Sequence, residues 1–222
     1  DVGNVRVAVQ LAEVGRDGLA DEVLLFKRLT RQVALQHGVY ATFLAKPMSD
    51  QPGSAMHIHQ SVLDIETGRN IFSTQAGKDS ALFRSYIAGL ARLLPQVAPM
   101  FAPNVNSFRR MRPDSDAPIN VQWGTDNRSC GLRVPISDSK NRRIENRLPG
   151  ADSNPYLAIA ASLICGYIGM VERMVPPKAI MGSAYNRART LPRTLEGALD
   201  RFSHCKPVRQ LLGEEFFEIF YA

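Results

Sequence analysis

The sequence contains little cysteine, and its cysteines match no binding or pairing pattern. Cys130, Cys165 and Cys205 are odd in number and widely spaced, which fits neither a disulfide framework nor a zinc site. We therefore expect a reduced, cytoplasmic protein whose thiols have no special chemistry. No apolar run is long enough to cross a bilayer, and the first residues lack the basic-then-apolar pattern of a signal peptide. A membrane partner is accordingly not expected.

Two common kinds of active-site motif are also missing. There is no glycine-rich Walker-type loop, so any nucleotide must be bound in another way. There is no G-x-S-x-G sequence and no cysteine with a suitable partner, which argues against acyl-enzyme chemistry. Internal repeats and low-complexity tracts are absent as well. The 222 residues suffice for one large domain, and the start at Asp1 is compatible with a fragment of a longer protein.

The chain does have an excess of positive charge, with a formal net charge of +6. Such a balance suits nucleic acid, but it equally suits a pocket for phosphates and carboxylates. The basic residues of one 20-residue stretch alternate with apolar, strand-like positions and lack interleaved stacking aromatics, which favours an arginine-lined pocket and predicts no nucleic-acid partner. These residues are Arg128, Arg133, Lys140, Arg142, Arg143 and Arg147.

The hydrophobic periodicity predicts a mixed α/β (α+β) domain with an antiparallel or mixed sheet, helices behind it and a site on the open face. A helix should begin at Pro155 with Asn154 as its cap, and it is apolar nearly all round, so we expect it to be buried and to end at Pro176. A long loop is expected at 102–118. The other predicted elements are helices at 19–37 and 80–94, a helical tail from about residue 194, and strands at 5–11, 40–48, 54–62, 119–123, 130–135 and 142–148.

Two of these strands carry candidate chemistry. Side chains alternate along a strand, so His57, His59 and Ser61 share one face while Met56 and Ile58 share the other. Neutral imidazoles can ligate a divalent metal or hydrogen-bond a nucleotide. A His-x-His pair on a merely solvated sheet face is an equally good alternative.

The strand at 142–148 repeats this arrangement. Arg143, Glu145 and Arg147 share a face, and Ile144 and Leu148 point the other way. A carboxylate between two guanidiniums is either a structural ion-pair ladder or a metal-and-phosphate site, and the spacing does not choose between them. Together the two strands would supply the parts that phosphoryl transfer needs, namely cations and positioning groups.

Four longer segments resemble the glutamine synthetase family. KPMSDQPGSAMHIHQS resembles a segment that usually reads KP…GSGMH-x-H-S, and NVNSFRRMRP…APIN resembles the glutamate-binding stretch. NRSCGLRVP and RRIENRLPGADSNPYLA resemble the ATP-side arginine motif and the RRIE-x-R signature. The motifs occur in the family's order and cover residues 1–175 well. Within the family, the wording is most similar to the γ-glutamylpolyamine synthetase branch.

The resemblance implies a glutamine-synthetase-type catalytic domain over residues 1–222. We expect a curved, mostly antiparallel sheet with helices on one side and the active site on the other. The N-terminal β-grasp domain and the first catalytic strands would be missing from this chain. The implied activity is ATP-dependent ligation of the γ-carboxyl of L-glutamate to ammonia or an amine through a γ-glutamyl phosphate. The family also implies a homo-oligomer of stacked rings.

The matched positions imply a role for each candidate residue. The metal, Mg²⁺ or Mn²⁺, would be held by His57, Glu145 and Asp1. Asp116 stands where many glutamine synthetases have a flap glutamate that receives the ammonium proton. The remaining roles are catalytic for Asp116 and Arg128, glutamate-binding for Gly53, Arg110 and Arg147, and ATP-binding for His59, Ser61, Arg133 and Arg143.

The first strand departs from the family pattern. The family has metal-ligand glutamates at the positions of Asp1 and Ala8, and alanine cannot ligate a metal. Arg6 replaces the usual glutamine. These changes motivate an alternative function, a catalytically degenerate family member with a structural or binding role.

Overall fold

The computed structural model describes residues 18–113 and 115–221, which form two compact units divided after Thr42. The described residues of the first unit, 18–42, contain the helix α1 (Leu19–Gln36). Asp21 and Glu22 lie in its first turn, where the helix dipole favours negative charge. The helix ends just before Gly38, whose φ of 70° suits a glycine. The predicted helix at 19–37 is thus confirmed, whereas the predicted strand at 5–11 lies outside the described residues.

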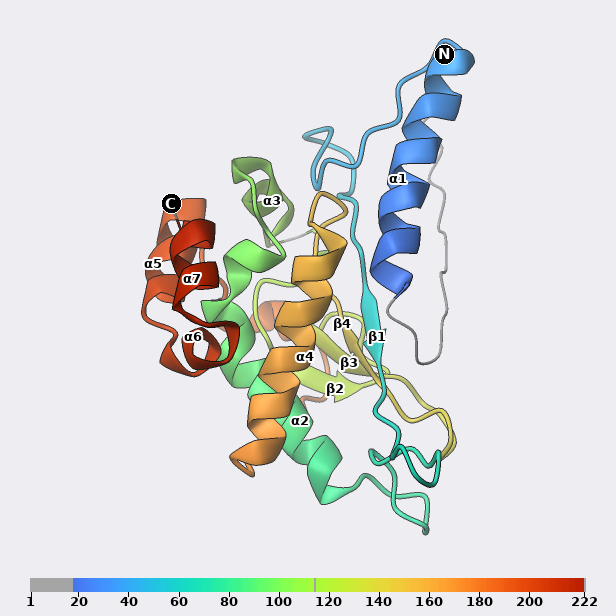
Figure 1. The fold of residues 1–222 in the computed structure, drawn as a ribbon, viewed down its shortest axis with the longest axis vertical. Helices are drawn as coiled ribbons and strands as arrows, with labels where there is room; N and C mark the ends of the chain where they lie inside the picture. Colours follow the sequence, from blue (N-terminus) through green and yellow to red (C-terminus); the bar gives the residue numbers. More distant parts are fainter. Residues whose placement is uncertain (1–17, 114, 222) are drawn as a thin grey trace. The chain divides into compact units, whose positions relative to one another are not determined.

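The second unit combines a small sheet with helices on one side (Figure 1). No helix in the described part of the chain has both the length and the hydrophobicity that a bilayer crossing requires. The strands of this unit are β1 (Ile58–Gln60), β2 (Trp123–Thr125), β3 (Leu132–Val134) and β4 (Ile144–Asn146). Its helices are α2 (Ala81–Leu93), α3 (Val105–Arg110), α4 (Pro155–Val171), α5 (Leu195–Ser203), α6 (Lys206–Leu212) and α7 (Glu214–Tyr221), with 3-10 turns η1 (Leu94–Gln96), η2 (Ala98–Met100) and η3 (Ala184–Asn186).

The sheet has the strand order β1-β4-β3-β2. β4 pairs antiparallel with both β1 and β3, whereas β2 pairs parallel with β3. The sheet is therefore mixed, and the expected antiparallel character holds only for the three strands that carry the candidate residues. This order places β1, which contains His59 and directly follows His57, beside β4, which contains Glu145.

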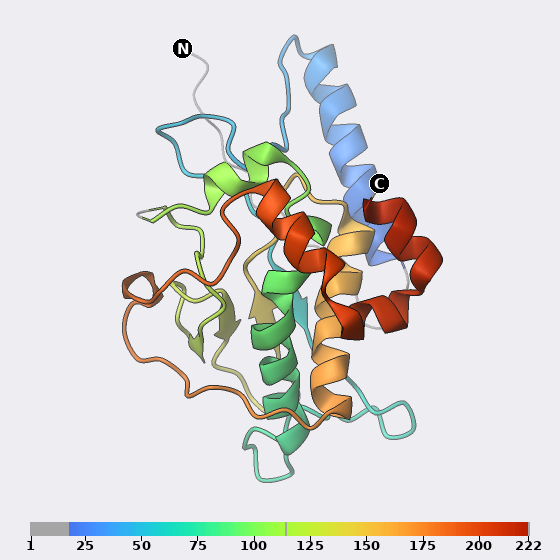
Figure 2. The ribbon, with the colours of Figure 1, turned by 90° about the vertical axis from the view of Figure 1, so that its left-hand side faces the viewer.

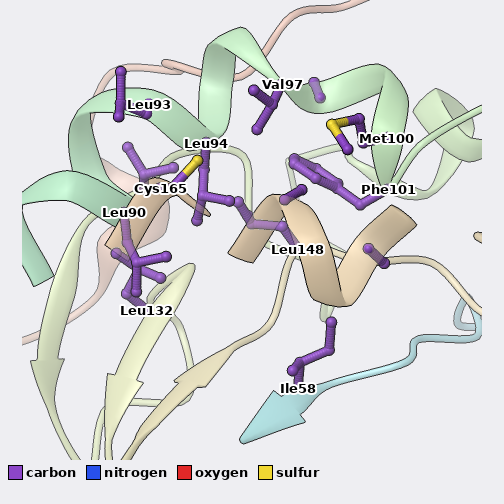
Figure 3. Close-up of a cluster of buried hydrophobic side chains, with 14 of the residues drawn as sticks. Ile58, Leu90, Leu93, Leu94, Val97, Met100, Phe101, Leu132, Leu148 and Cys165 are labelled. Atoms are coloured by element: carbon purple, nitrogen blue, oxygen red, sulfur yellow. The ribbon is translucent and has the colours of Figure 1, made fainter. Parts of the chain in front are cut away.

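The two faces of the sheet differ as the alternation predicts. The Tyr86 hydroxyl on α2 donates to the Gln60 side chain of β1, and Asn146 Nδ2 of β4 donates to Ser162 Oγ of α4 over 2.8 Å. This face therefore lies against α2 and α4. Figure 3 shows Ile58 and Leu132 pointing into a cluster with side chains such as Leu90 of α2. The odd-numbered neighbours on β1 and β4 consequently face away from the helices.

The helices α2 and α4 run side by side on one face of the sheet (Figure 2). Their contact is close because Gly89 of α2 faces Gly169 of α4: an added Cβ on Gly169 would lie 2.7 Å from the Gly89 Cα. The Ser80 hydroxyl caps α2 and the Asn154 side chain caps α4, as the sequence predicts for Asn154. Backbones this close leave no space for a side chain at either glycine.

Several sequence predictions for this unit are wrong. The α4 helix is not buried all round, since Leu163 and Tyr167 are 44% and 52% exposed. It ends at Val171 rather than near Pro176, because Arg173 adopts a positive φ of 50° and breaks the helical backbone. The expected loop at 102–118 contains α3.

The predicted strand at 40–48 is not formed, although all its residues are described. Lys46 instead exchanges backbone hydrogen bonds with the Asn106 side chain at 2.9 Å, and the Ala45 carbonyl accepts from Ser54 N. The strand predicted at 119–123 is shifted to Trp123–Thr125 for a similar reason. Val121 N donates to Thr190 Oγ1, so this backbone is satisfied outside the sheet.

Candidate functional site

The sheet register brings three candidate side chains into one row. His59 of β1 lies opposite Glu145 of β4, and Glu145 lies opposite Arg133 of β3. Residues paired directly across neighbouring strands point to the same face. This row therefore lies on the face away from α2 and α4, where the alternation along each strand predicts a polar surface.

Glu145 is the centre of this surface. Its carboxylate accepts from Arg133 Nη1 at 2.7 Å and from Arg147 Nη1 at 2.8 Å, and its Oε1 lies 3.0 Å from His57 Nδ1. The Glu145 side chain is only 3% exposed, against 32% for His57. Burial disfavours the charge, but the hydrogen bonds from His57 and Arg133 and the charge of Arg147 outweigh it and hold the pKa of Glu145 well below its usual range. Glu145 is therefore an ionised carboxylate at the core of a cationic cluster.

Arg133 is held between two carboxylates. Besides Glu145, its guanidinium donates to Asp126 Oδ1, from Nε at 3.0 Å and also from Nη2. Burial alone would lower the pKa of Arg133, but the hydrogen bonds with Glu145 and Asp126 outweigh it and raise that pKa. A clamp on both sides of the planar guanidinium fixes its orientation on the open face.

Asp126 was not anticipated from the sequence. It follows β2 directly with a φ of 49°, a conformation that aspartate tolerates better than most residues, and its backbone N donates to the Val134 carbonyl at 2.8 Å. The sequence did offer one signal for it: Asp126 is the acidic residue of the GTDNRS connection and stands two residues before Arg128.

His59 and Arg143 form the edge of the surface. Arg143 Nε donates to His59 Nδ1 at 3.4 Å, and its Nη1 donates to the Asn141 carbonyl. Burial is the main cause that lowers the pKa of His59, with the charge of Arg143 acting in the same direction against that of Glu145. His59 is thus neutral near pH 7 and keeps a nitrogen able to accept a hydrogen bond. Ser61 lies beyond the end of β1, is exposed, and its hydroxyl bonds no other described residue.

Arg110 and Gly53, both expected to bind glutamate, contact each other below the surface. Arg110 is 3% exposed, and its guanidinium donates to the carbonyls of Leu148 at 2.7 Å and Arg147 at 3.0 Å. Burial lowers the pKa of Arg110 to about 10. An added Cβ on Gly53 would lie 2.8 Å from Arg110 Cγ. In this arrangement Arg110 supports the end of β4, and its direct role toward glutamate stays a prediction.

The remaining candidates lie at the margins. Arg128 is exposed and forms no ion pair within the described ranges, so its guanidinium is free to meet an anion. Asp116 is also exposed. Burial is the main cause that raises the pKa of Tyr185, and the negative charge of Asp116 raises it further, whereas the positive charges of Arg147 and Arg110 lower it. Tyr185 is therefore within electrostatic reach of Asp116, Arg147 and Arg110, although no sequence signal marked it. Asp1, Arg6 and Ala8 lie outside the described residues.

His57 and Glu145 supply part of the ligand set that a divalent cation needs. An imidazole and a carboxylate 3.0 Å apart can supply two ligands to Mg²⁺ or Mn²⁺. Among residues 18–113 and 115–221, no group of three His, Cys, Asp or Glu side chains lies close enough to hold a metal alone. His57 and Glu145 would thus be two ligands of a set completed by other groups.

The chain has clear relatives among known proteins. Residues 9–222 match the glutamine synthetase catalytic domain family. Type-1 glutamine synthetase 2 of Dictyostelium discoideum is 38% identical over 209 residues, which cover 90% of this chain and 40% of that protein. Gamma-glutamylputrescine synthetase PuuA of Escherichia coli (strain K12) is 37% identical, covering 91% and 43%, and glutamate–isopropylamine ligase of a Pseudomonas species is 37% identical, covering 90% and 44%.

These matches show the family of the chain and how much of its relatives the chain covers. The chain spans less than half the length of the curated relatives it matches. The similarity covers the sheet, the helices behind it and all the described site residues. The names divide between glutamine synthetases and ligases of larger amines. The chain therefore belongs to the glutamine synthetase family, and its residues 9–222 match the catalytic domain of that family.

Proposed function

We propose that this chain is the catalytic part of an ATP-dependent ligase that joins the γ-carboxyl of L-glutamate to an amine. The observation that carries the proposal is the Glu145 cluster, an ionised, buried carboxylate bonded to two guanidiniums and an imidazole on an open sheet face. Such a surface offers fixed positive charge to anionic substrates. The family supplies the reaction class.

The proposed reaction has two steps. The glutamate γ-carboxylate attacks the terminal phosphorus of ATP, which forms an acyl phosphate and releases ADP. The amine then attacks the acyl carbon, a C–N bond forms, inorganic phosphate leaves and the amine loses a proton. Both steps develop negative charge on phosphate oxygens, so cations held in advance lower the barrier.

The residues of the site divide this work. Arg133 and the exposed Arg128 would face the phosphates, and neutral His59 would accept a hydrogen bond from the nucleotide. Arg147 would hold a glutamate carboxylate while its backbone is supported by Arg110. Asp116 would receive the proton of the amine. A divalent cation held by His57 and Glu145 would supply further positive charge to the phosphates.

The amine is proposed to be larger than ammonia. Relatives of similar identity are named as a gamma-glutamylputrescine synthetase, a glutamate–isopropylamine ligase and, at 36% identity, the gamma-glutamylethanolamide synthetase GlnA4 of Streptomyces coelicolor. Asp116, one carbon shorter than the glutamate usual in the family, leaves more space at the amine position. The ring-shaped homo-oligomer, the β-grasp domain and the cytoplasmic location stay predictions.

The first experiment is ADP release by the natural full-length protein. It is supplied with glutamate, Mg²⁺ or Mn²⁺, and amines from ammonia to putrescine and spermidine. We expect release that depends on glutamate and is fastest with one larger amine. Release without glutamate would point to a different reaction. No release from folded protein would favour the degenerate alternative, for which Ala8 is the sequence evidence.

A second prediction concerns Asp126, which we propose positions Arg133. Asp126→Asn removes the charge of the clamp but keeps a residue that tolerates the positive φ. We expect the KM for ATP to rise about threefold to tenfold with a smaller change in kcat, because a charge-assisted hydrogen bond contributes roughly 1.5–3 kcal/mol and part of it is retained. Steady-state ADP release against ATP concentration measures this.

The matched control is Asp79→Asn. Asp79 forms a similar ion pair with Arg142 at 2.6 Å, and within the described residues this pair does not bond the Glu145 carboxylate. We expect this control to leave the KM for ATP unchanged. Equal changes in both variants would mean that Asp126 acts only through general stability.

A further inference from the structure

A second cationic site lies apart from the Glu145 cluster, at the start of α5. It is a cavity of about 440 Å³ whose lining includes Arg189, Arg193, Thr194, Asp200 and Arg201. None of the candidate residues of the proposed active site lines it. The volume falls within the range of small-molecule sites, roughly 300–1,000 Å³. The cavity is thus large enough for more than an isolated inorganic ion.

Two of the three arginines that line this cavity, Arg189 and Arg201, are held by backbone carbonyls rather than by carboxylates. Arg201 Nη1 donates to the Thr190 carbonyl at 2.6 Å. Arg189 donates from Nη1 to the Pro192 carbonyl at 3.4 Å and from Nη2 to the Met111 carbonyl. Within the described ranges, neither forms an ion pair with an acidic residue. Both guanidiniums are therefore oriented while their charge is not neutralised.

The charges around the cavity do not balance. Three arginines line it against one carboxylate, Asp200, which lies 3.9 Å from His204 Nδ1 and pairs with none of them. Burial lowers the pKa of Arg189, and the charge of Arg193 lowers it further, so these two cations are near each other. Arg193 is exposed and has no hydrogen-bond or ion-pair partner for its side chain within the part of the chain that the structure describes. An anion would relieve this repulsion.

The backbone at the start of α5 also adds partial positive charge to the cavity. Thr194 is the cap of the nine-residue helix α5, and its side chain accepts from Gly197 N at 3.1 Å. Both residues line the cavity. The amino end of a helix carries partial positive charge and favours phosphate oxygens. The helix end thus adds to the field of the three arginines.

We infer that this cavity binds the phosphate group of a small phosphorylated molecule, at a site distinct from the one proposed for ATP. Guanidiniums that approach from separate positions match the several oxygens of a phosphate better than a single planar carboxylate. The volume beyond the phosphate would hold the rest of the molecule. The inference does not depend on the proposed ligase activity.

The test is calorimetric titration of the natural full-length protein with inorganic phosphate and, separately, with glycerol 3-phosphate. The variant is Arg193→Glu, chosen because Arg193 supports no other described side chain. The control is Arg187→Glu, the same charge change at an exposed arginine that does not line the cavity. We expect Arg193→Glu to weaken binding of both probes about tenfold or more, and Arg187→Glu to change it less than about twofold.

Each outcome decides the question. Equal weakening in the two variants would mean general electrostatic attraction and would overturn the site, as would unchanged binding in Arg193→Glu. Tighter binding of glycerol 3-phosphate than of inorganic phosphate supports a phosphorylated molecule as the ligand. Tighter binding of inorganic phosphate would contradict the claim that the cavity also holds the rest of such a molecule. Phosphate bound at the Glu145 cluster would persist in both variants, so failure of the proposed ligase activity leaves this comparison intact.

Discussion

Glu145→Gln should reduce glutamate-dependent ADP release by about 100-fold or more, because it removes the charge on which the candidate site is built. Glutamine keeps the size of the side chain, but it is neutral and presents an amide NH₂ group where the carboxylate now accepts from a guanidinium. Arg133, Arg147 and His57 would lose their common partner. A divalent cation would lose its carboxylate ligand at the same position. Coupled-enzyme measurement of ADP release at saturating ATP and glutamate checks the result.

The same substitution should also weaken the fold, so stability must be measured beside activity. The side chains of Arg133 and Arg147 are 16% and 11% exposed, and removing one partner of a buried ion pair leaves uncompensated charge. Glu145→Ala should therefore cost about 3–5 kcal/mol of unfolding free energy, and Glu145→Gln less, since an acceptor oxygen remains. Activity is compared at a temperature where circular dichroism shows both proteins folded. Full turnover in folded Glu145→Gln would sink the assignment of this cluster as the active site.

Gly169→Ala should lower the free energy of unfolding by about 3 kcal/mol or more, because the added methyl group would meet the backbone of a neighbouring helix. A Cβ at this position would lie 2.2 Å from the Ser85 carbonyl oxygen and 2.7 Å from the Gly89 Cα, both on α2. Backbone atoms of a packed helix cannot turn aside as a side chain can. The helices α2 and α4 would have to separate, and buried neighbours such as Ile87 and Ile168 would lose contacts. Urea denaturation followed by circular dichroism measures the change.

Gly197→Ala provides the matched control. Gly197 is also helical, in α5, but its added Cβ would meet only Thr194 Oγ1 at 3.4 Å, an ordinary contact. Alanine is the better helix former by roughly 1 kcal/mol, so this variant should be unchanged or slightly more stable. If Gly169→Ala unfolds at the same urea concentration as the parent protein, the close contact of the two helices is wrong.

The sequence predicted the faces of the site well. The period of two along 54–62 and 142–148 placed His57 and His59 on one polar face and Glu145 and Arg147 on another. The structure confirms that Ile58 and Ile144 are buried while these residues lie on the opposite face. The Asn154 cap of α4 was also predicted correctly, since a cap and the first helical turn involve only neighbouring residues.

Predictions that needed knowledge of distant partners did less well. The residues at 40–48 have the composition of a strand, but the backbone of Lys46 bonds the Asn106 side chain and that of Ala45 bonds Ser54 N instead. Tyr167 belongs to an apolar helix, yet it is half exposed because α2 and the sheet cover only one side of α4. Composition reports which residues favour burial, and it does not report how much neighbouring surface is available to bury them.

The sequence by itself determined most local elements, such as α1 and the capped start of α4, together with the polar and apolar faces of the strands and the family. Only the tertiary structure decided which cations meet Glu145. Arg133 and Arg147 do so, whereas Arg143 contacts His59 and Arg110 is used by backbone carbonyls. The physical reason is that these contacts depend on the strand order β1-β4-β3-β2 and its register, which join residues up to about 90 positions apart. Local periodicity fixes the direction of a side chain, and the pairing of distant strands fixes its partner.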